Sequence, residues 1–113
     1  MPPQGLTIAA ACSIGSTLPD VEQVTSYGGR GLKVKGRLFA CQAVHKSAEP
    51  NSLMVRIDLK RRAVLLTENP GAYYLTDHYA KHPAMLVRLS RIDRSSLREL
   101  LTESWEYVIG GVK

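Results

Sequence analysis

The chain has 113 residues and a formal net charge of +5, with 44% hydrophobic and 22% charged residues. These proportions are ordinary for a globular domain, and they exclude a disordered, collagen-like or coiled-coil chain. The longest apolar runs span only a few residues, which predicts no transmembrane helix. We therefore expect a single domain over residues 1–113.

The two cysteines match neither a disulfide scaffold nor a metal motif. Cys12 and Cys41 both lie among apolar neighbours, which predicts two buried free thiols. Free thiols are typical of a reducing compartment. Residues 1–16 contain no Lys or Arg, so the basic start of a secretory signal is missing. We therefore expect a cytoplasmic protein.

The first part of the chain predicts a helix followed by a strand and a loop. Small and apolar residues fill residues 5–16, and Pro19 prevents continuation because the residue before a proline is pushed out of the helical region. Residues 21–25 predict a short strand. The three glycines within residues 26–31 predict a loop.

Alternation of apolar and polar residues then predicts an antiparallel hairpin. Residues 32–35 alternate, and Lys35-Gly36 predicts a two-residue turn, since glycine accepts a positive φ. Residues 37–44 return as the second strand, residues 45–52 are polar and predict a loop, and residues 53–59 alternate again. The residues expected on one face of this last strand are Leu53, Val55, Ile57 and Leu59.

The last helix is the clearest element of the second half. Asp93 is a good N-cap, with Ser96-x-x-Glu99 as a second possible cap, and apolar residues recur at helical spacing until Gly110-Gly111. The stripe comprises Leu97, Leu100, Leu101, Ser104, Trp105 and Val108, with Trp105 expected in the core. The other expected elements are a short helix over 60–68, a strand over 72–76, a polar turn over 77–83 and a strand over 84–92.

This order of elements predicts an α+β fold. Hairpin-length connections imply an antiparallel sheet, and the first and last helices bury their apolar stripes most economically on one face of that sheet. The opposite face would then carry cations. They are Lys33, Lys35, Arg56 and Arg88.

Positive charge is concentrated in the middle third of the chain. Residues 30–62 contain nine Lys and Arg residues against two acidic residues, a local net charge of +7. Such a concentration favours a polyanionic partner, nucleic acid first and an anionic membrane second. The alternative is a solvated face that only keeps the protein soluble.

The segment 60–62 (Lys-Arg-Arg) is the densest charge run. Its three cations would contact successive phosphates, or they would simply form an exposed helix start. Cations are locally unfavourable at a helix N-terminus, which Asp58 offsets in part. This unfavourable placement favours a function for the run.

The hairpin around Gly36 carries Lys33, Lys35 and Arg37. A protruding basic hairpin either tracks a phosphate backbone or protects a sheet edge from aggregation. The predicted nucleic-acid-binding residues are Lys33, Lys35, Arg37, Arg56, Lys60, Arg61, Arg62 and Arg88.

Motifs that carry other chemistry are few. His78 and His82 have the spacing of two helical metal ligands, but Pro83 follows at once and no Cys or Glu is near in sequence. A loop fixed by hydrogen bonds from His78 and Tyr79 is the favoured interpretation. Neither a nucleophile elbow, a P-loop nor a dinucleotide fingerprint is present. We expect no enzyme activity, no metal and no cofactor.

The tyrosines offer surfaces on which bases stack, but aromatic residues make up only 6% of the chain, fewer than a dedicated single-strand binder uses. Most are expected to be half-buried with a solvated hydroxyl. They are Tyr27, Tyr73, Tyr74, Tyr79 and Tyr107.

A series of short motifs, taken together in order and spacing, resembles the MmcQ/YjbR family over residues 17–109. The motifs are Leu18-Pro19, Ser26-Tyr27-Gly28, Lys33-Val34, Leu38-Phe39-Ala40, Arg56-x-Asp58, Asp77-His78-Tyr79-x-x-x-Pro83, Val87-x-Leu89 and Leu100-Leu101-x-x-Ser104-Trp105. Residues 1–16 depart from the charged first helix usual in that family, which leaves the role of this helix open.

The resemblance implies a frataxin-like (CyaY-like) α+β fold with a double-wing arrangement, in a small cytoplasmic bacterial protein that binds DNA. Frataxin-type iron handling needs a carboxylate-rich first helix and strand, where this chain has only Asp20 and Glu22. We expect a monomer that binds the phosphate backbone largely independently of sequence, without a membrane partner. The alternative is a small non-enzymatic interaction or regulatory domain with an acidic partner.

Overall fold

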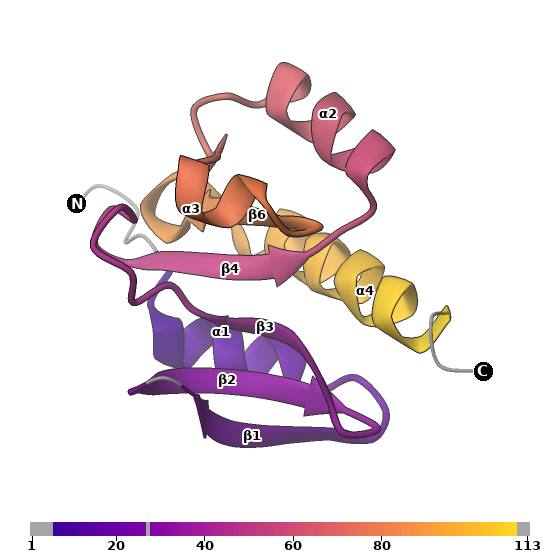
Figure 1. The fold of residues 1–113 in the computed structure, drawn as a ribbon. Coiled ribbons are helices and arrows are strands. Elements are labelled where there is room, and N and C mark those ends of the chain that lie inside the picture. The colour runs from indigo at the N-terminus through magenta and orange to yellow at the C-terminus, as the bar shows by residue number, and fades with distance from the viewer. Residues whose placement is uncertain (1–5, 27, 111–113) are drawn as a thin grey trace.

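A computed structural model describes residues 6–26 and 28–110, and it contains one antiparallel sheet between helices (Figure 1). The strand order is β1-β2-β3-β4-β6-β5. The elements in chain order are α1 (Ile8–Gly15), β1 (Val21–Ser26), β2 (Gly29–Val34), β3 (Arg37–Gln42), β4 (Ser52–Arg56), α2 (Leu59–Glu68), β5 (Tyr73–Tyr74), α3 (Asp77–Ala80), β6 (Ala84–Arg88), η1 (Leu89–Arg91) and α4 (Arg94–Gly110). The predicted α+β fold is confirmed.

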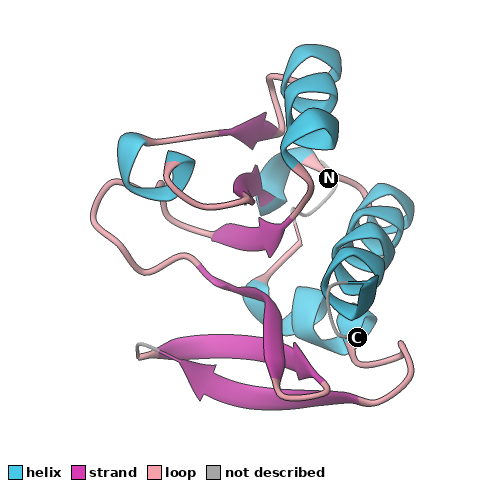
Figure 2. Ribbon diagram, turned by 45° about the vertical axis from the view of Figure 1, so that its right-hand side comes forward, coloured by secondary structure: helices cyan, strands magenta, loops and turns pink. Residues whose placement is uncertain are grey.

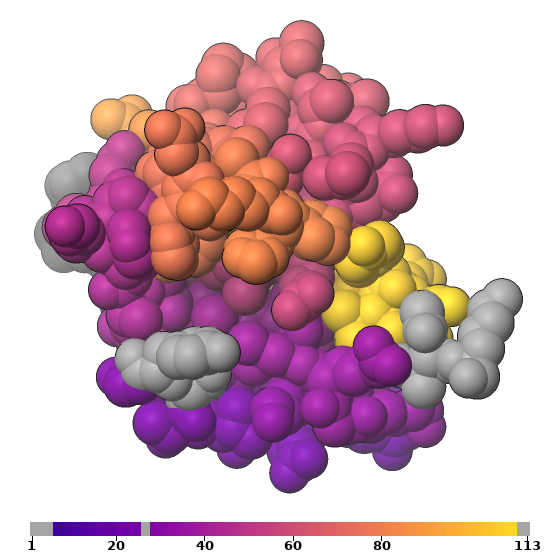
Figure 3. Space-filling model, in the orientation of Figure 1, coloured from indigo at the N-terminus to yellow at the C-terminus, as the bar shows by residue number. Residues whose placement is uncertain are grey.

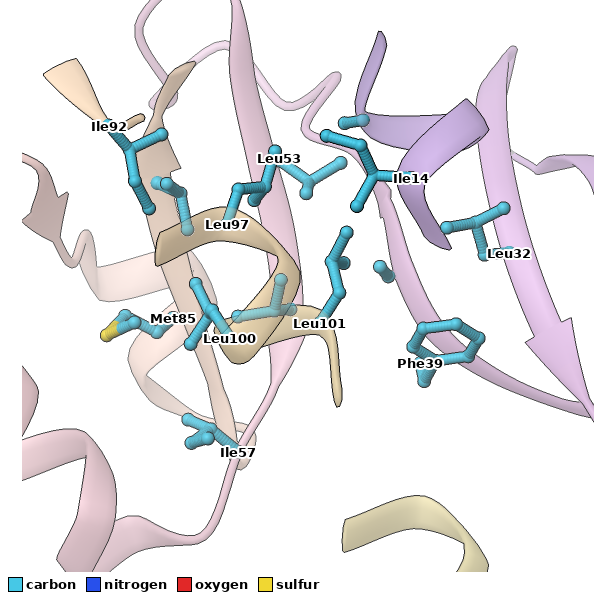
Figure 4. Close-up of a cluster of buried hydrophobic side chains, with 14 of the residues drawn as sticks. Ile14, Leu32, Phe39, Leu53, Ile57, Met85, Ile92, Leu97, Leu100 and Leu101 are labelled. Atoms are coloured by element: carbon cyan, nitrogen blue, oxygen red, sulfur yellow. The ribbon is translucent and has the colours of Figure 1, made fainter. Parts of the chain in front are cut away.

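Helices α1 and α4 pack on the same face of the sheet, here called the inner face, as the apolar stripes predict (Figure 2). Ile14 of α1 and Leu101 of α4 are 3% exposed or less, and they join Leu32, Phe39 and Leu53 of the sheet in one cluster (Figure 4). Removal of this apolar surface from water is the main term that stabilises the fold.

The β2–β3 hairpin has the predicted two-residue turn. Lys35 and Gly36 have φ values of 51° and 78°, the left-handed conformation that such a turn requires. The register shifts between Leu32 and Lys33, because Leu32 pairs with Ala40 and Lys33 with Leu38. Phe39 is the extra residue of this bulge, and its side chain is fully buried.

Ser104 supports the bulge from α4. Its hydroxyl donates a 2.6 Å hydrogen bond to the carbonyl oxygen of Phe39, and both residues are completely buried. A bulge disrupts the ladder locally, so a donor from outside the sheet satisfies the carbonyl. The polar position in the predicted apolar stripe of the last helix therefore has a structural role.

The loop predicted over residues 26–31 is wrong. Strands β1 and β2 pair from Val21 with Val34 to Ser26 with Gly29. Gly31 lies inside β2, where an added Cβ would stand 3.0 Å from a Leu38 methyl carbon. Gly31 is therefore explained by side-chain crowding on the sheet, which leaves little room for a Cβ, and not by a turn.

Three other elements depart from expectation. The polar turn over 77–83 contains the short helix α3, and the strand over 84–92 stops at Arg88 because η1 follows. Leu59 was expected on the buried face but is 55% exposed, since α2 begins there. The Asp58 carboxylate caps that helix, accepting from the backbone N–H groups of Lys60 and Arg61 at 3.0 and 3.2 Å.

The cap of α4 is Asp93, whose carboxylate accepts from the Ser96 N–H at 2.7 Å. Trp105 of the same helix lies at the margin of the core rather than inside it, being only partly buried. Its indole N–H donates to the Pro19 carbonyl at 3.0 Å. The indole therefore ties α4 to the connection between α1 and β1.

The opposite, outer face of the sheet is not the open basic surface that alternation predicted. Cys41, Met54, Ala84 and Leu86 form a second apolar cluster there, with Tyr79 packed against it. Strands β3, β4 and β6, which carry these residues, lie in the middle of the sheet, where each has a neighbouring strand on both sides. Both cysteines are buried and free, as predicted.

Candidate nucleic-acid interface and an adjoining pocket

Most of the predicted cationic residues gather at one end of the sheet. The β2–β3 turn, the end of β4 and the start of α2 all lie at this end, where α4 also ends (right-hand side of Figure 1). Arg37 and Arg56 line one cavity of about 650 Å³ together with Glu106, Tyr107 and Gly110 of α4. We call this region the basic end.

Arg88 does not belong to the basic end. It pairs with Ser52 at the start of β4, whereas Arg56 ends that strand. Its guanidinium makes two 2.8 Å hydrogen bonds to the Glu49 carboxylate and lies 4.3 Å from the centroid of the Tyr74 ring. It also donates to the carbonyls of Pro70 and Gly71. These contacts give Arg88 a structural role.

Three predicted cations at the basic end make internal contacts. Arg61 forms an ion pair with Glu103 of α4 at 2.7 Å, and this hydrogen bond raises the pKa of the guanidinium. Arg62 donates to the carbonyls of His82 and Ala84 at 2.9 and 3.1 Å. Lys35 lies 3.6 Å from Asp20 in an exposed pair, which contributes little to stability.

The other four predicted cations, which we call the open cations, are Lys33, Arg37, Arg56 and Lys60. Within residues 6–26 and 28–110, their side chains make no hydrogen bond or ion pair. Glu22 faces Lys33 across the β1–β2 ladder, and Glu106 shares the cavity of Arg37 and Arg56. These carboxylates moderate the positive charge of the basic end.

A pocket of about 520 Å³ adjoins the basic end on the outer face, between the sheet and α3. Its apolar lining comes from Leu38, Cys41, Val44, Met54 and Ala84. Figure 3 shows the outer face in space-filling form, with a recess below the α3 segment, which is drawn in orange. We call this hollow the outer-face pocket.

Three ring side chains meet beside the pocket. The His45 and His78 rings are stacked, with centroids 3.6 Å apart and planes 5° from parallel, and Tyr79 meets His78 edge-on at 4.9 Å. The Tyr79 hydroxyl accepts a 3.3 Å hydrogen bond from the His45 backbone N–H. Tyr79 thus ties α3 to the 45–52 loop, as an acceptor and not as the predicted donor. Among the described residues, His78 contributes by ring stacking and makes none of the predicted hydrogen bonds to backbone carbonyls.

The pKa values of His78 and Cys41 are both shifted in the direction that favours the uncharged side chain. Desolvation lowers the pKa of His78, helped by the nearby charges of His45, Lys81 and His82. Burial raises the pKa of the Cys41 thiol to about 11, against the opposing effect of Arg56. At neutral pH the thiol is therefore protonated and a poor nucleophile.

A metal is not supported by the arrangement of these groups. Within the described part of the chain, no three His, Cys, Asp or Glu residues are grouped so that they could hold a metal ion. His78 and His82 both line the outer-face pocket, but they do so beside apolar carbon and sulfur atoms rather than carboxylates.

Sequence reasoning missed the outer-face pocket. It singled out His78, His82 and Tyr79 but not His45, which joins them only through the packing of the 45–52 loop against α3. The alternation of β4 placed Met54 opposite Val55, a signal for an outer-face residue, yet it gave no sign of a hollow. Tyr27, named as a stacking candidate, lies outside the described residues.

Residues 16–107 match the YjbR family, and the chain belongs to that family. The fold is similar to the crystal structure of Deinococcus radiodurans protein DR2400, a DUF419 domain, with a TM-score of 0.76 and 22% identity over 95% of this chain and 81% of that one. The resemblance seen in the sequence motifs is thus confirmed for the family and for the α+β fold.

Proteins of Mycobacterium bovis and Mycobacterium tuberculosis, each called uncharacterized, are 46% identical to this chain over 41 residues. The matched segment covers 36% of this chain and 32% of each relative, so the similarity spans only about a third of those proteins. No helix within the described residues is long and apolar enough to cross a membrane.

Proposed function

We propose that this YjbR protein binds nucleic acid through the phosphate backbone, at the basic end of the sheet. The supporting observation is the position of Arg37 and Arg56 beside one cavity, with side chains that make no hydrogen bond or ion pair to other residues within 6–26 and 28–110. A guanidinium presents several donors in a plane, which matches the oxygens of a phosphate. The role is one of binding without catalysis, by a cytoplasmic monomer.

The binding is weak and largely independent of sequence. Phosphate contacts give affinity and position but carry no base information. Contacts by the four open cations would give a slope of log affinity against log salt of about −3.6, since each neutralised phosphate of duplex DNA contributes about 0.9. The dissociation constant at physiological salt then lies in the non-specific range of roughly 10⁻⁴ to 10⁻⁶ M.

Charge reversal tests the location of the interface. Fluorescence anisotropy with a labelled duplex at low salt would compare Arg37→Glu and Arg56→Glu with Arg94→Glu and Arg98→Glu. The last two are exposed residues near the start of α4, away from the basic end, and they change the net charge by the same amount. We expect the first two variants to lose most of the affinity and the control pair to lose little.

Equal losses in both pairs would mean that only net charge attracts the nucleic acid, and the interface proposal would fail. No binding by the wild-type protein even at low salt would favour an acidic protein as the partner, the second function compatible with an exposed basic end.

A further inference from the structure

The outer-face pocket has an uncharged floor of suitable size for a planar ring. Cys41, Met54 and Ala84 of β3, β4 and β6 are each 9% exposed or less. The pocket volume of about 520 Å³ lies within the range of small-ligand sites. Such a floor is suited to flat apolar surface and not to a free ion, because the three residues that form it carry no charge at neutral pH.

Ring side chains form one wall of the pocket. The stacked pair of His45 and His78 and the ring of Tyr79 all line it. Two imidazoles 3.6 Å apart repel each other when both are protonated, which agrees with the lowered pKa of His78. Histidine and tyrosine rings are side chains on which unstacked nucleobases pack.

Polar groups stand where a nucleotide would need them. Gln42 and His82 line the pocket, and the Gln42 side-chain amide N–H groups and the His82 ring can bond the edge of a base, while the Gln42 amide oxygen accepts from the Arg30 backbone N–H at 3.3 Å. Arg56 lines both this pocket and the cavity that it shares with Arg37 at the basic end. A phosphate bound at Arg56 would therefore lie next to the mouth of the pocket.

From these placements we infer that the outer-face pocket receives one unpaired nucleotide, with its base against the ring wall and its phosphate at Arg56. The inference rests on the proposed function and specifies its substrate as single-stranded nucleic acid. A paired base of a duplex is stacked between its neighbours and has to be flipped out before it enters a pocket.

The test separates the base from the backbone. Fluorescence anisotropy at one salt concentration would compare a labelled oligothymidylate, an abasic strand with the same number of phosphates and a duplex of the same length. Thymidine monophosphate serves as a competitor. The variants are His78→Ala, which removes the exposed outer ring of the stacked pair, and Tyr107→Ala, which removes an exposed ring that lines only the neighbouring cavity.

We expect the strand with bases to bind roughly fivefold to a hundredfold more tightly than the abasic strand, from the usual stacking contribution of one base. His78→Ala should remove most of that advantage and leave the affinity for the abasic strand unchanged, while Tyr107→Ala should preserve the advantage. Loss of the advantage in Tyr107→Ala instead would move the base to the other cavity and overturn the inference.

The failures of the two proposals are distinguishable. Equal affinity for the abasic strand and the strand with bases would overturn the pocket inference and leave the backbone interface intact. Absence of binding to every strand would overturn the backbone interface. If thymidine monophosphate then still protected wild-type protein against thermal unfolding but not His78→Ala, the pocket would stand as a site for a free nucleotide.

Discussion

The two faces of the sheet differ in how completely they are covered. On the inner face, α1 and the long helix α4 close over the strands, and residues such as Leu101 and Phe39 have no exposed surface. On the outer face the covering helix, α3, has only four residues, and a pocket of about 520 Å³ remains beside it. The inner face therefore provides most of the stability, while the outer face keeps apolar surface that a ligand can cover.

Truncation of one large side chain on each face should give the largest difference in the free energy of unfolding. Leu101→Ala should lower the free energy of unfolding by about 3–5 kcal/mol, because a closed core cannot fill the cavity. Met54→Ala on the outer face should cost about 2 kcal/mol or less, since water enters from the adjoining pocket and the transfer term dominates. Urea unfolding of both variants measures the difference, and equal losses would contradict the contrast between the faces.

Removal of Arg88 should affect stability more than binding. Its hydrogen bonds to Glu49, Pro70 and Gly71 are partly exposed, so Arg88→Ala should lower the free energy of unfolding by about 1–2 kcal/mol. Arg56→Ala, which breaks no hydrogen bond or ion pair among the described residues, should leave the unfolding midpoint nearly unchanged and weaken binding to DNA. The opposite pattern would show that Arg88 belongs to the interface.

The smallest expected effect is the loss of folding stability at acidic pH. Hydrogen bonding to Arg88 lowers the pKa of Glu49, and the Ser96 N–H lowers the pKa of Asp93. The unfolded chain therefore takes up protons before the folded chain does, so this stabilisation is present above the ordinary carboxyl pKa of about 4 and is lost as the pH falls further. The urea midpoint should fall between about pH 5 and pH 2.

The variants Glu49→Gln and Asp93→Asn should each flatten this decline in the urea midpoint. Since both carboxylates are exposed, the change should be small. An unchanged pH profile in both variants would show that these two carboxylates do not contribute to the pH dependence of stability.

Periodicity predicted the elements that bury one face. The stripe of α4, the turn at Lys35-Gly36 and the packing of two helices on one side of the sheet all follow from local patterns. Periodicity gave wrong predictions where contacts between distant residues determine the local structure. Gly31 indicated a loop but lies in a strand against Leu38, and Arg88 alternated with apolar neighbours but folds over Tyr74.

The charged residues of the candidate site could be predicted from the sequence, but their arrangement in space could not. The sequence identified all eight cations, yet only the structure distinguishes those held by partners, such as Arg61 with Glu103, from the open cations. The outer-face pocket could not be predicted from the sequence. Its residues His45 and His78 are 33 positions apart in the printed sequence, and they meet only because a loop packs on α3.

The salt dependence of duplex binding tests the central claim most directly. We expect a slope of log affinity against log salt of about −3.6 for the wild-type protein, reduced in magnitude by about 0.9 in Arg37→Ala and by about 0.9 again in the Arg37→Ala, Arg56→Ala double variant. Arg94→Ala, at the far end of α4, should retain the wild-type slope. A slope unchanged by the double variant, or reduced equally by Arg94→Ala, would contradict a phosphate interface at the basic end.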